Sequence, residues 1–244
     1  MKHDNRPQRP LASLRVAITG GTSGLGFALL RQFAEAGASV AFVARDAERV
    51  ARTAQGLPGT HGFVGDVAKK DDIYPLATAI AGSLGGVDVL INNASDLGPV
   101  PLALLADTDC EDLERALATN LVGPFRLTKA LLGALAASAR IGRGAVVLNI
   151  SSDAAITPYR GWGAYGASKA ALHHLSRIWN EELSELRIRV LSCDPGDMDT
   201  PLHALAVPEA DPASLRSPAE SARELISAIV EALPRPALIS RTTA

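Results

Sequence analysis

The amino-acid sequence predicts a single α/β domain, in which a doubly wound parallel sheet carries helices on both faces. Short, nearly continuous aliphatic runs alternate with longer stretches of helical periodicity, as expected for strands that are buried on both faces. The 244 residues suit one domain, and no linker, repeat or low-complexity tract divides them. Hydrophobic residues make up 47% and aromatic residues only 4%, so the core must be mainly aliphatic.

The expected elements follow one another in β-α-β order. The strands are Arg15–Thr19, Ser39–Ala44, His61–Val64, Val87–Ile91, Ala145–Ile150 and Arg187–Ser192, with a weaker candidate at Ala237–Ser240. The helices between them are Leu25–Ala36, Ala47–Gln55, Lys70–Leu84, Glu111–Ala137 and Ala164–Leu186. A last helix is expected after Ser217-Pro-Ala-Glu220, because this is the pattern of a capping box with proline at the first helical position.

Composition excludes several classes of protein. The net charge is −2, so there is no basic surplus to bind nucleic acid. Cys110 and Cys193 show neither metal-site spacing nor a disulfide framework. His173 and His174 are adjacent, and neighbouring side chains on a helix point about 100° apart. We therefore expect no metal.

The sequence also bears on location. No apolar run approaches the ~18 residues needed to cross a bilayer. Residues 1–10 are polar and lack the apolar region of a secretion signal. We expect residues 1–10 to be a flexible polar leader, residues 11–244 to be the single domain, and the protein to be cytoplasmic, without nucleic-acid or membrane partners.

Tyr165 and Lys169 are the residues most indicative of chemistry. They lie four residues apart, on one face of an expected helix, with Ser152 thirteen residues upstream of the tyrosine. A nearby ammonium group favours the ionised phenol, and lowering its pKa from ~10 to about 7 takes roughly 4 kcal/mol. This spacing indicates proton transfer on a carbonyl or alcohol. The alternative is an amphipathic tyrosine beside a solvated lysine.

A glycine-rich turn follows the first expected strand. The segment Thr19-Gly-Gly-Thr-Ser-Gly-Leu-Gly26 leads directly into a helix, so its backbone N–H groups can approach a pyrophosphate. The positive end of the helix dipole adds to this attraction. The domain is therefore expected to be of the Rossmann type and to bind a dinucleotide.

The end of the second expected strand bears on the choice of dinucleotide. The strand ends at Ala44-Arg45-Asp46, where an acidic residue would bind a ribose diol and an arginine would pair with a 2′-phosphate. Arg45 favours NADP(H), with NAD(H) possible. Alternatively, Arg45 is solvated and Asp46 serves only as the N-cap of the next helix.

From roughly residue 12 to residue 240 the chain resembles the short-chain dehydrogenase/reductase family. The resemblance consists of motifs in the family's order. They are Thr19–Gly26, Asp66-Val67, Asn92-Asn-Ala-Ser95, Asn120, Ser152, Tyr165 with Lys169, and Pro195-Gly196 followed by Thr200.

The resemblance implies a catalytic role for four residues. Tyr165 would exchange a proton with the substrate oxygen, which Ser152 would hold. Lys169 would bind the nicotinamide ribose and lower the tyrosine pKa, and Asn120 would hold a water that relays protons to solvent. The function implied is an NADP(H)-dependent oxidoreductase that interconverts a carbonyl and a secondary or primary alcohol.

The resemblance also implies a cofactor-binding set. Its members come from the glycine turn, from the ends of later strands and from the catalytic helix. They are Gly20, Thr22, Ser23, Gly24, Leu25, Gly26, Arg45, Asp66, Val67, Asn93, Ala94, Tyr165, Lys169, Pro195, Gly196, Met198 and Thr200.

Two positions depart from the family pattern, and one has a rival. Ser95 stands where the family has glycine, and Asp194 stands where asparagine is common. Ser151 competes with Ser152 for the catalytic role, but the spacing to the tyrosine favours Ser152. We expect Ser151 to bond to the backbone instead, and Asn93 and Asn149 are candidates for ties between strand ends and loops.

Three loops are expected to contact the substrate, namely Ser95–Leu104, Asp153–Trp162 and Asp197–Arg216. The last is a candidate lid with apolar residues Met198, Leu202, Leu205 and Val207, and the facing wall would contain Ile156, Tyr159 and Trp162. Ordinary loop packing explains these residues equally well. His203 is expected to be solvated rather than to reach the substrate.

Two further expectations concern partners and an alternative function. The resemblance implies that the two long helices pair between subunits, so we expect a homodimer or homotetramer. The alternative to catalysis is a cofactor-sensing binding protein without turnover. The residues do not identify the substrate.

Overall fold

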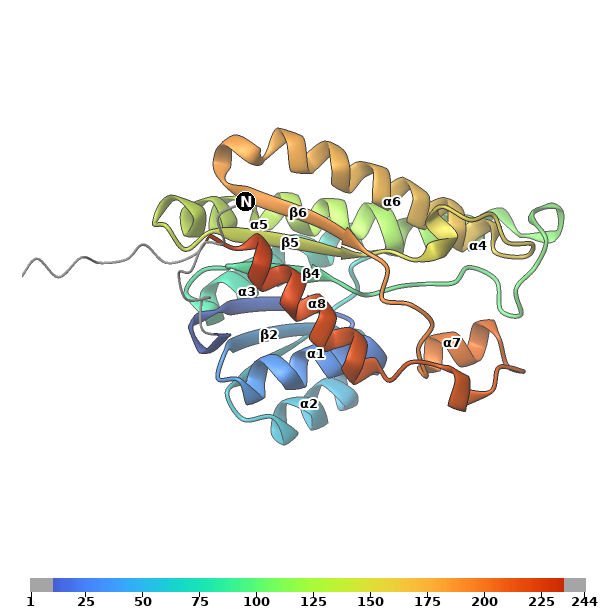
Figure 1. Cartoon of the computed structure of the whole chain (residues 1–244), viewed down its shortest axis with the longest axis horizontal. Helices are drawn as coiled ribbons and strands as arrows, with labels where there is room; N and C mark the ends of the chain where they lie inside the picture. Colours follow the sequence, from blue (N-terminus) through green and yellow to red (C-terminus); the bar gives the residue numbers. More distant parts are fainter. Residues whose placement is uncertain (1–10, 235–244) are drawn as a thin grey trace, which may run out of the picture.

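Six parallel strands form one sheet in the order β3-β2-β1-β4-β5-β6 (Figure 1) in this computed structural model, which describes residues 11–234. The strand order reverses between β1 and β4, and at such a switch point open α/β sheets bind their ligands. The strands are β1 Arg15–Thr19, β2 Ser39–Ala44, β3 Thr60–Val64, β4 Val89–Asn92, β5 Ala145–Ile150 and β6 Ile188–Cys193. The leader and the weak strand candidate Ala237–Ser240 lie outside the described residues.

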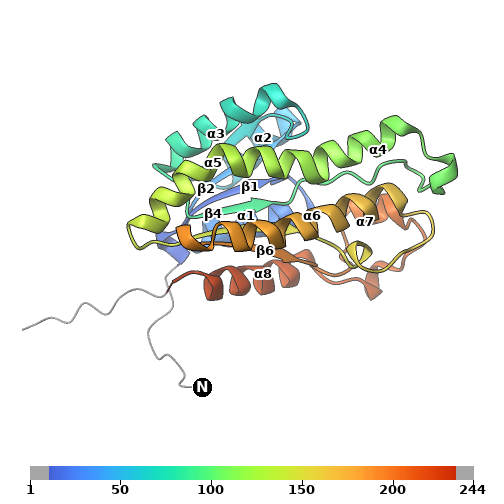
Figure 2. The same ribbon diagram turned by 90° about the horizontal axis from the view of Figure 1, so that it is seen from above.

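Helices cover both faces of this sheet, as Figure 2 shows from above. They are α1 Gly24–Glu35, α2 Ala47–Gly56, α3 Lys70–Leu84, α4 Cys110–Leu117, α5 Gly123–Arg140, α6 Gly163–Glu182, α7 Pro201–Ala206 and α8 Pro218–Ala232. One core lies between the sheet and α1 with α8, and a second lies between the sheet and α3 with α5. Along β1, Val16 and Ile18 enter the first core and Ala17 the second. The predicted doubly wound α/β fold is confirmed.

The long helix expected over Glu111–Ala137 is wrong as a single helix. It consists of α4, a π-helical segment Ala118–Val122, and α5. Pro124 has no N–H to donate to the carbonyl of Asn120 four residues earlier, so regular α-helical bonding cannot continue there. Irregular turns of this kind are frequent at functional sites, and this one contains Asn120.

Two predicted helix starts have the expected caps. The Ser217 side chain and Glu220 form a capping box with the backbone at the start of α8. Asp46 Oδ1 accepts a hydrogen bond from the N–H of Arg49, 2.9 Å away, and so caps α2. The cap fixes Asp46 at the carboxyl end of β2.

A buried polar network ties β4 and β5 to α6. Asn92 Nδ2 donates to Asn149 Oδ1 at 2.8 Å, and Asn149 Nδ2 donates to Ser176 Oγ at 2.8 Å. All three side chains are almost fully buried. Asn92 Oδ1 is buried without a partner in the described chain, but the bonds of Asn149 to Asn92 and to Ser176 link β4, β5 and α6 and so fix where α6 lies against the sheet. Asn149 thus has the tying role considered for it.

A buried carboxylate holds the opposite end of the sheet together. The Asp88 side chain is fully buried and lies 2.8 Å from Arg15 Nη2 and 2.7 Å from Arg143 Nη2. Burial raises the pKa of Asp88, but the hydrogen bonds from Arg143 and Arg15 outweigh this effect and lower the pKa to about 2. Asp88 is therefore ionised and paired at neutral pH.

No helix among the described residues is long and apolar enough to span a membrane.

Asp88→Asn should destabilise the protein by about 3–5 kcal/mol at pH 7, because it leaves two arginines without their buried partner. The folded-state pKa is depressed, so the contribution of Asp88 is present above pH 4 and is lost as the pH falls towards 2. Urea unfolding of both proteins at pH 7, and in steps from pH 4 to pH 2, measures this difference. An equal free energy of unfolding for the two proteins at pH 7 would contradict the assignment.

Candidate functional site

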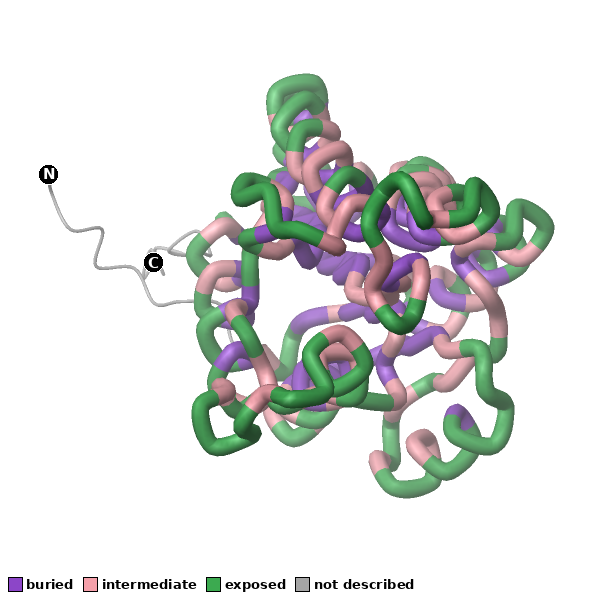
Figure 3. The backbone as a smooth tube through the Cα atoms, turned by 90° about the vertical axis from the view of Figure 1, so that its right-hand side faces the viewer, coloured by how far each residue is buried: buried purple, intermediate pink, exposed green. Residues whose placement is uncertain are grey.

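A cavity of about 710 Å³ opens at the carboxyl ends of the strands. This volume lies within the range of about 300–1,000 Å³ that is usual for ligand pockets. The cavity is lined by residues that follow β1, β2, β4, β5 and β6 and by the segment around α7. Figure 3 views this edge of the molecule, where exposed loops surround buried segments.

Every residue of the expected cofactor-binding set except Gly26 lines this cavity. Gly26 lies under the turn, where an added Cβ would stand 2.1 Å from the carbonyl oxygen of Gly20. Gly20 has φ +70°, and an added Cβ there would stand 2.9 Å from Asn93 Nδ2. Only glycine allows this close approach of loop and helix, so the residues present fit a dinucleotide.

Asn93 fixes the glycine turn against β4. Its Nδ2 donates to the carbonyl of Thr19 at 2.9 Å and more weakly to that of Gly20. Thr19 Oγ1 in turn accepts hydrogen bonds from the main-chain N–H groups of Asn93 and Ala94, both at 3.0 Å. The turn is therefore held in place before any ligand binds.

Arginines occupy the part of the cavity beyond β2. Arg45 is exposed and lines the cavity, and Asp46 beside it is engaged as the α2 cap. Arg49 lines the same part of the cavity and was not singled out from the sequence. The sequence places Arg49 one helical turn after Arg45, and this spacing could have identified it as a second arginine at the cavity.

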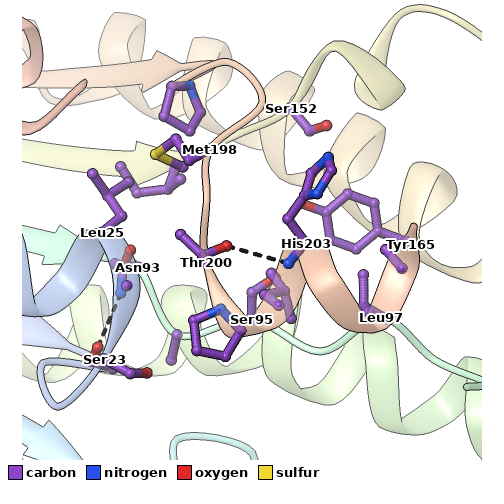
Figure 4. A pocket seen from close by; sticks show the side chains of 18 of the residues that line it. Ser23, Leu25, Asn93, Ser95, Leu97, Ser152, Tyr165, Met198, Thr200 and His203 are labelled. Atoms are coloured by element: carbon purple, nitrogen blue, oxygen red, sulfur yellow. Dashed lines mark hydrogen bonds between the residues drawn. The ribbon is translucent and has the colours of Figure 1, made fainter. Parts of the chain in front are cut away.

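Tyr165 and Lys169 lie on α6 and face the end of β5. Lys169 Nζ donates to the carbonyl of Ile150 at 2.8 Å and lies 5.4 Å from the centre of the Tyr165 ring. Tyr165 is 8% exposed and Lys169 2%. Both line the cavity together with Ser152. Figure 4 shows Tyr165 and Ser152 in this cavity.

The expected lowering of the tyrosine pKa is absent from this structure. Burial raises the pKa of Tyr165 to about 12, against smaller opposing contacts from the side chains of Ser152 and Ser95. Burial also lowers the pKa of Lys169 to about 8. Loss of solvent dominates, and the lysine ammonium is directed at the Ile150 carbonyl rather than at the phenol. The phenol is therefore protonated and suited to donate a hydrogen bond.

An acidic residue that the sequence did not single out orients Ser152. Ser152 Oγ donates to Asp153 Oδ1 at 3.0 Å and accepts from the N–H of Ala154 at 3.2 Å. Tyr159 donates its phenolic hydrogen to Asp153 Oδ2 at 2.7 Å. This hydrogen bond is the main cause of the lowered pKa of Asp153. The signal in the sequence was a carboxylate directly after the candidate serine.

Ser151 makes its link to the sheet through its main chain. Its N–H donates to the carbonyl of Cys193 at 2.8 Å. The Oγ atom is buried and has no hydrogen-bond partner in the described chain. Ser151 thus bonds to the backbone at the strand end as expected, but through its main chain and not through its hydroxyl.

Asn120 is fully buried and does not line the cavity, although its neighbour Thr119 does. Asn120 Nδ2 donates to the carbonyl of Asp96 and to Ser168 Oγ, and Oδ1 accepts from the N–H of Asp96 and from Ser95 Oγ. These four bonds use the full capacity of the amide. Ser95, the departure from the family pattern, thus has a partner that glycine lacks.

The segment from Asp197 to Arg216 packs over Tyr165. Leu202 and Ala206 of α7 pack against a cluster formed by Leu97, Ala154 and Tyr165. Met198 pairs with Arg216 in an isolated bridge that closes the base of the segment. Met198, Leu202 and Val207 line the cavity as expected.

Several expectations for this region are wrong. Leu205 and Ile156 are 54% and 73% exposed and do not line the cavity, because they lie on the outer sides of their segments. The His203 side chain is only 13% exposed, and Nε2 lies 3.9 Å from Asp197 Oδ1. It faces the cavity beside Tyr165 (Figure 4), so it is not a solvated residue. Tyr159 and Trp162 line the opposite wall.

Across residues 11–234, no group of three or more histidine, cysteine, aspartate or glutamate side chains is placed to hold a metal ion.

Known proteins provide an independent comparison. A family model described as short chain dehydrogenase matches residues 15–210. The chain is 34% identical over 187 residues to a serine 3-dehydrogenase of Agrobacterium fabrum, covering 76% of this chain and 72% of that protein.

Solved structures with bound cofactors share the fold. A 3-ketoacyl-(acyl-carrier-protein) reductase from Brucella melitensis complexed with NADH gives a TM-score of 0.81 at 26% identity, covering 88% of this chain and 90% of that one. A short chain dehydrogenase from Shigella flexneri complexed with NADP gives a TM-score of 0.82 at 25% identity, covering 92% of each chain. Together with the glycine cradle and the converging serine, tyrosine and lysine, these matches show that the chain belongs to the short-chain dehydrogenase/reductase family.

Proposed function

We propose that this protein is an NADP(H)-dependent oxidoreductase that interconverts a carbonyl and a secondary or primary alcohol, with Tyr165 as the general acid and base. One observation carries the proposal. Ser152, Tyr165 and Lys169 converge at one end of a cavity whose other end is a glycine cradle suited to a dinucleotide. The relatives with bound NADH and NADP support a nicotinamide cofactor.

The catalytic groups divide the work of proton transfer. The bound cofactor supplies or accepts the hydride. Tyr165, protonated because it is buried, donates its hydrogen to the carbonyl oxygen in the reducing direction. Ser152 holds the same oxygen, and Lys169 is positioned at the end of β5 to bind the ribose next to the reacting ring.

Proton return to solvent is proposed to pass by Asn120. The side-chain amide is fully engaged with protein groups, so a water at this residue would bond to the main-chain carbonyl. That carbonyl is the one to which Pro124 cannot donate. This arrangement changes the role expected from the sequence: the side chain holds the local backbone, and the main chain offers the acceptor.

We propose NADP(H) as the favoured cofactor because Arg45 and Arg49 line the part of the cavity beyond β2, while Asp46 is engaged as a cap. A guanidinium group pairs well with a 2′-phosphate.

We further propose that residues 11–244 act as one catalytic domain in the cytoplasm and form a homodimer or homotetramer. Phe125 of α5 and Ile178 of α6 are 37% and 42% exposed, and Phe125 stacks on Trp179 at 5.2 Å. An exposed apolar strip over two neighbouring helices suits a second subunit. Sedimentation equilibrium tests this assembly.

Tyr165→Phe should lower kcat by at least about 100-fold, because the variant keeps the ring but loses the general acid. Cofactor absorbance in a panel of small ketones and alcohols measures turnover, and nucleotide fluorescence measures binding. Binding should stay within about twofold, since the phenol is not a phosphate ligand. Retained turnover would remove Tyr165 from the mechanism. Binding without turnover in the unmodified protein would favour the cofactor-sensing alternative.

Arg45→Ala should weaken NADPH binding by about 10–100-fold and NADH binding by less than about twofold, because only NADPH carries the 2′-phosphate. Fluorescence titration of both nucleotides measures the dissociation constants. Arg52→Ala is the matched control, since Arg52 is an exposed arginine on α2 that does not line the cavity. Equal affinity of the unmodified protein for the two nucleotides would refute the preference.

Lys169→Met should abolish turnover and raise the free energy of unfolding at pH 7 by about 1–3 kcal/mol, since one pKa unit corresponds to ~1.4 kcal/mol. The lysine pKa is lowered in the folded state, so the cost of burying its charge is present below pH 8 and is relieved as the pH rises towards 10.5. Urea unfolding measures the effect, and the exposed Lys70→Met serves as control. A less stable Lys169→Met protein at pH 7 would show that the lysine supports the fold.

A further inference from the structure

The Asp153 carboxylate is fixed at the wall of the cavity beside the catalytic serine. Ser152 Oγ and the Tyr159 hydroxyl donate to its two oxygens at 3.0 Å and 2.7 Å. These bonds favour the ionised carboxylate. Asp153 therefore places a negative charge next to the Ser152 hydroxyl, which is proposed to hold the reacting oxygen.

No cation of residues 11–234 forms an ion pair with Asp153. Lys169 is the one cationic side chain lining the catalytic end of the cavity, and its ammonium donates to the Ile150 carbonyl. Arg45 and Arg49 follow β2, at the opposite end. Asp153 is exposed at the cavity wall, so solvent screens its charge in the open cavity, and a bound ammonium group would take the place of that solvent.

Two further carboxylates reinforce this field. Asp194 and Asp197 line the cavity, and Asp194 acts on Tyr165 through its charge, as Asp153 does. Asp197 Oδ1 lies 3.9 Å from His203 Nε2 at the mouth of the cavity, and the Asp197 side chain is 77% exposed. A cleft lined by charges of one sign concentrates ligands of the other sign. A carboxylate substrate would meet repulsion here, and the cavity offers no arginine at this end to bind it.

We propose that Asp153 selects substrates that carry an ammonium group on the carbon next to the reacting carbinol or carbonyl, namely vicinal amino alcohols and the corresponding α-amino ketones. This inference rests on the oxidoreductase function proposed above. In a vicinal amino alcohol the nitrogen lies within hydrogen-bond distance of its own oxygen. Ser152 donates its hydrogen to Asp153 Oδ1 in this structure, and on binding it would turn that hydrogen to the substrate oxygen. Asp153 Oδ1 is then free to accept from the ammonium group beside that oxygen.

The redox balance needs no additional reactant. In the oxidising direction the carbinol C–H bond gives a hydride to the bound oxidised cofactor. Tyr165 first releases its own proton to solvent, and its phenolate then takes the proton of the O–H bond. The ammonium group takes no part in bond making, and its pairing with Asp153 positions the carbinol.

A matched series of methyl carbinols tests the proposal. The four compounds carry different groups on the carbon next to the same carbinol. The group is an ammonium in 1-amino-2-propanol, a hydroxyl in 1,2-propanediol, a methyl in 2-butanol and a carboxylate in 3-hydroxybutanoate. We expect kcat/KM to be about tenfold or more higher for the amine than for 2-butanol, and lowest for the carboxylate. In 4-amino-2-butanol the ammonium stands one carbon further away, and it should lose most of the preference.

Variants of the chain separate charge from shape. Asp153→Asn keeps the size of the side chain and an acceptor for Ser152 but removes the charge. The ratio of kcat/KM for the amine to that for 2-butanol should fall by about 10–100-fold, chiefly through KM. Glu209→Gln removes a charge of the same sign from the covering segment at a residue that does not line the cavity, and should leave the ratio unchanged.

Calorimetric binding of the same alcohols to Tyr165→Phe loaded with NADP⁺ provides a readout without turnover. Tight amine binding that Asp153→Asn weakens supports the inference, even if the unmodified protein oxidises none of the alcohols and the proposed reaction is thereby refuted. Oxidation of 2-butanol without any preference for the amine leaves the reaction standing and overturns the inference. Preference for the carboxylate, or binding of none of the alcohols, also overturns it.

Discussion

The geometry of the site depends on how α6 is attached to the end of β5. Two side chains seven residues apart on one face of the helix make the attachment. Lys169 donates to the carbonyl of Ile150, and Ser176 accepts from Asn149, the preceding residue of the same strand. This pairing fixes the helix in both rotation and position along its axis. Tyr165, one turn before Lys169, is thereby placed at the cavity.

This attachment has a cost that the rest of the fold offsets. A lysine with 2% exposure loses the solvation of its charge, which is why its pKa falls to about 8. The aliphatic cores on both faces of the sheet stabilise the fold against this cost, and so does the paired Asp88 at the opposite end of the sheet. In the proposed reaction the buried position preorganises the phenol. It is withdrawn from water and held protonated next to the place where a carbonyl oxygen would bind.

The sequence predicted the strands, the cap of α8 and nearly all of the expected cofactor-binding residues of the cavity, because these depend on local patterns. Aliphatic runs identify buried strands, and Gly20 and Gly26 are required where no Cβ fits. Longer-range effects were missed. The break before Pro124 lies inside the stretch Glu111–Ala137, which was expected to be one helix, and the pKa of Tyr165 depends on burial that only tertiary packing creates. The burial of His203 beside Tyr165 likewise depends on loops distant in sequence that meet at the cavity.

The end of the cavity that contains Tyr165 is acidic, and the family motifs alone do not predict this feature. Family motifs define where a hydride and a proton move, but the groups that face the substrate come from the segments after β5 and β6. In this chain those segments bring three carboxylates to the cavity. The proposed reactivity and the proposed selectivity thus rest on different parts of the sequence, as is usual where function is built on a shared scaffold.

The central claim is that α6 presents the hydroxyl of Tyr165, together with that of Ser152, to a single substrate oxygen. A crystal structure of the protein with oxidised cofactor and a small secondary alcohol tests this directly. The account predicts that both hydroxyl oxygens lie about 2.6–3.2 Å from the alcohol oxygen, with Lys169 still at the end of β5. An alcohol bound elsewhere in the cavity, or a Tyr165 side chain turned away from it, would contradict the account.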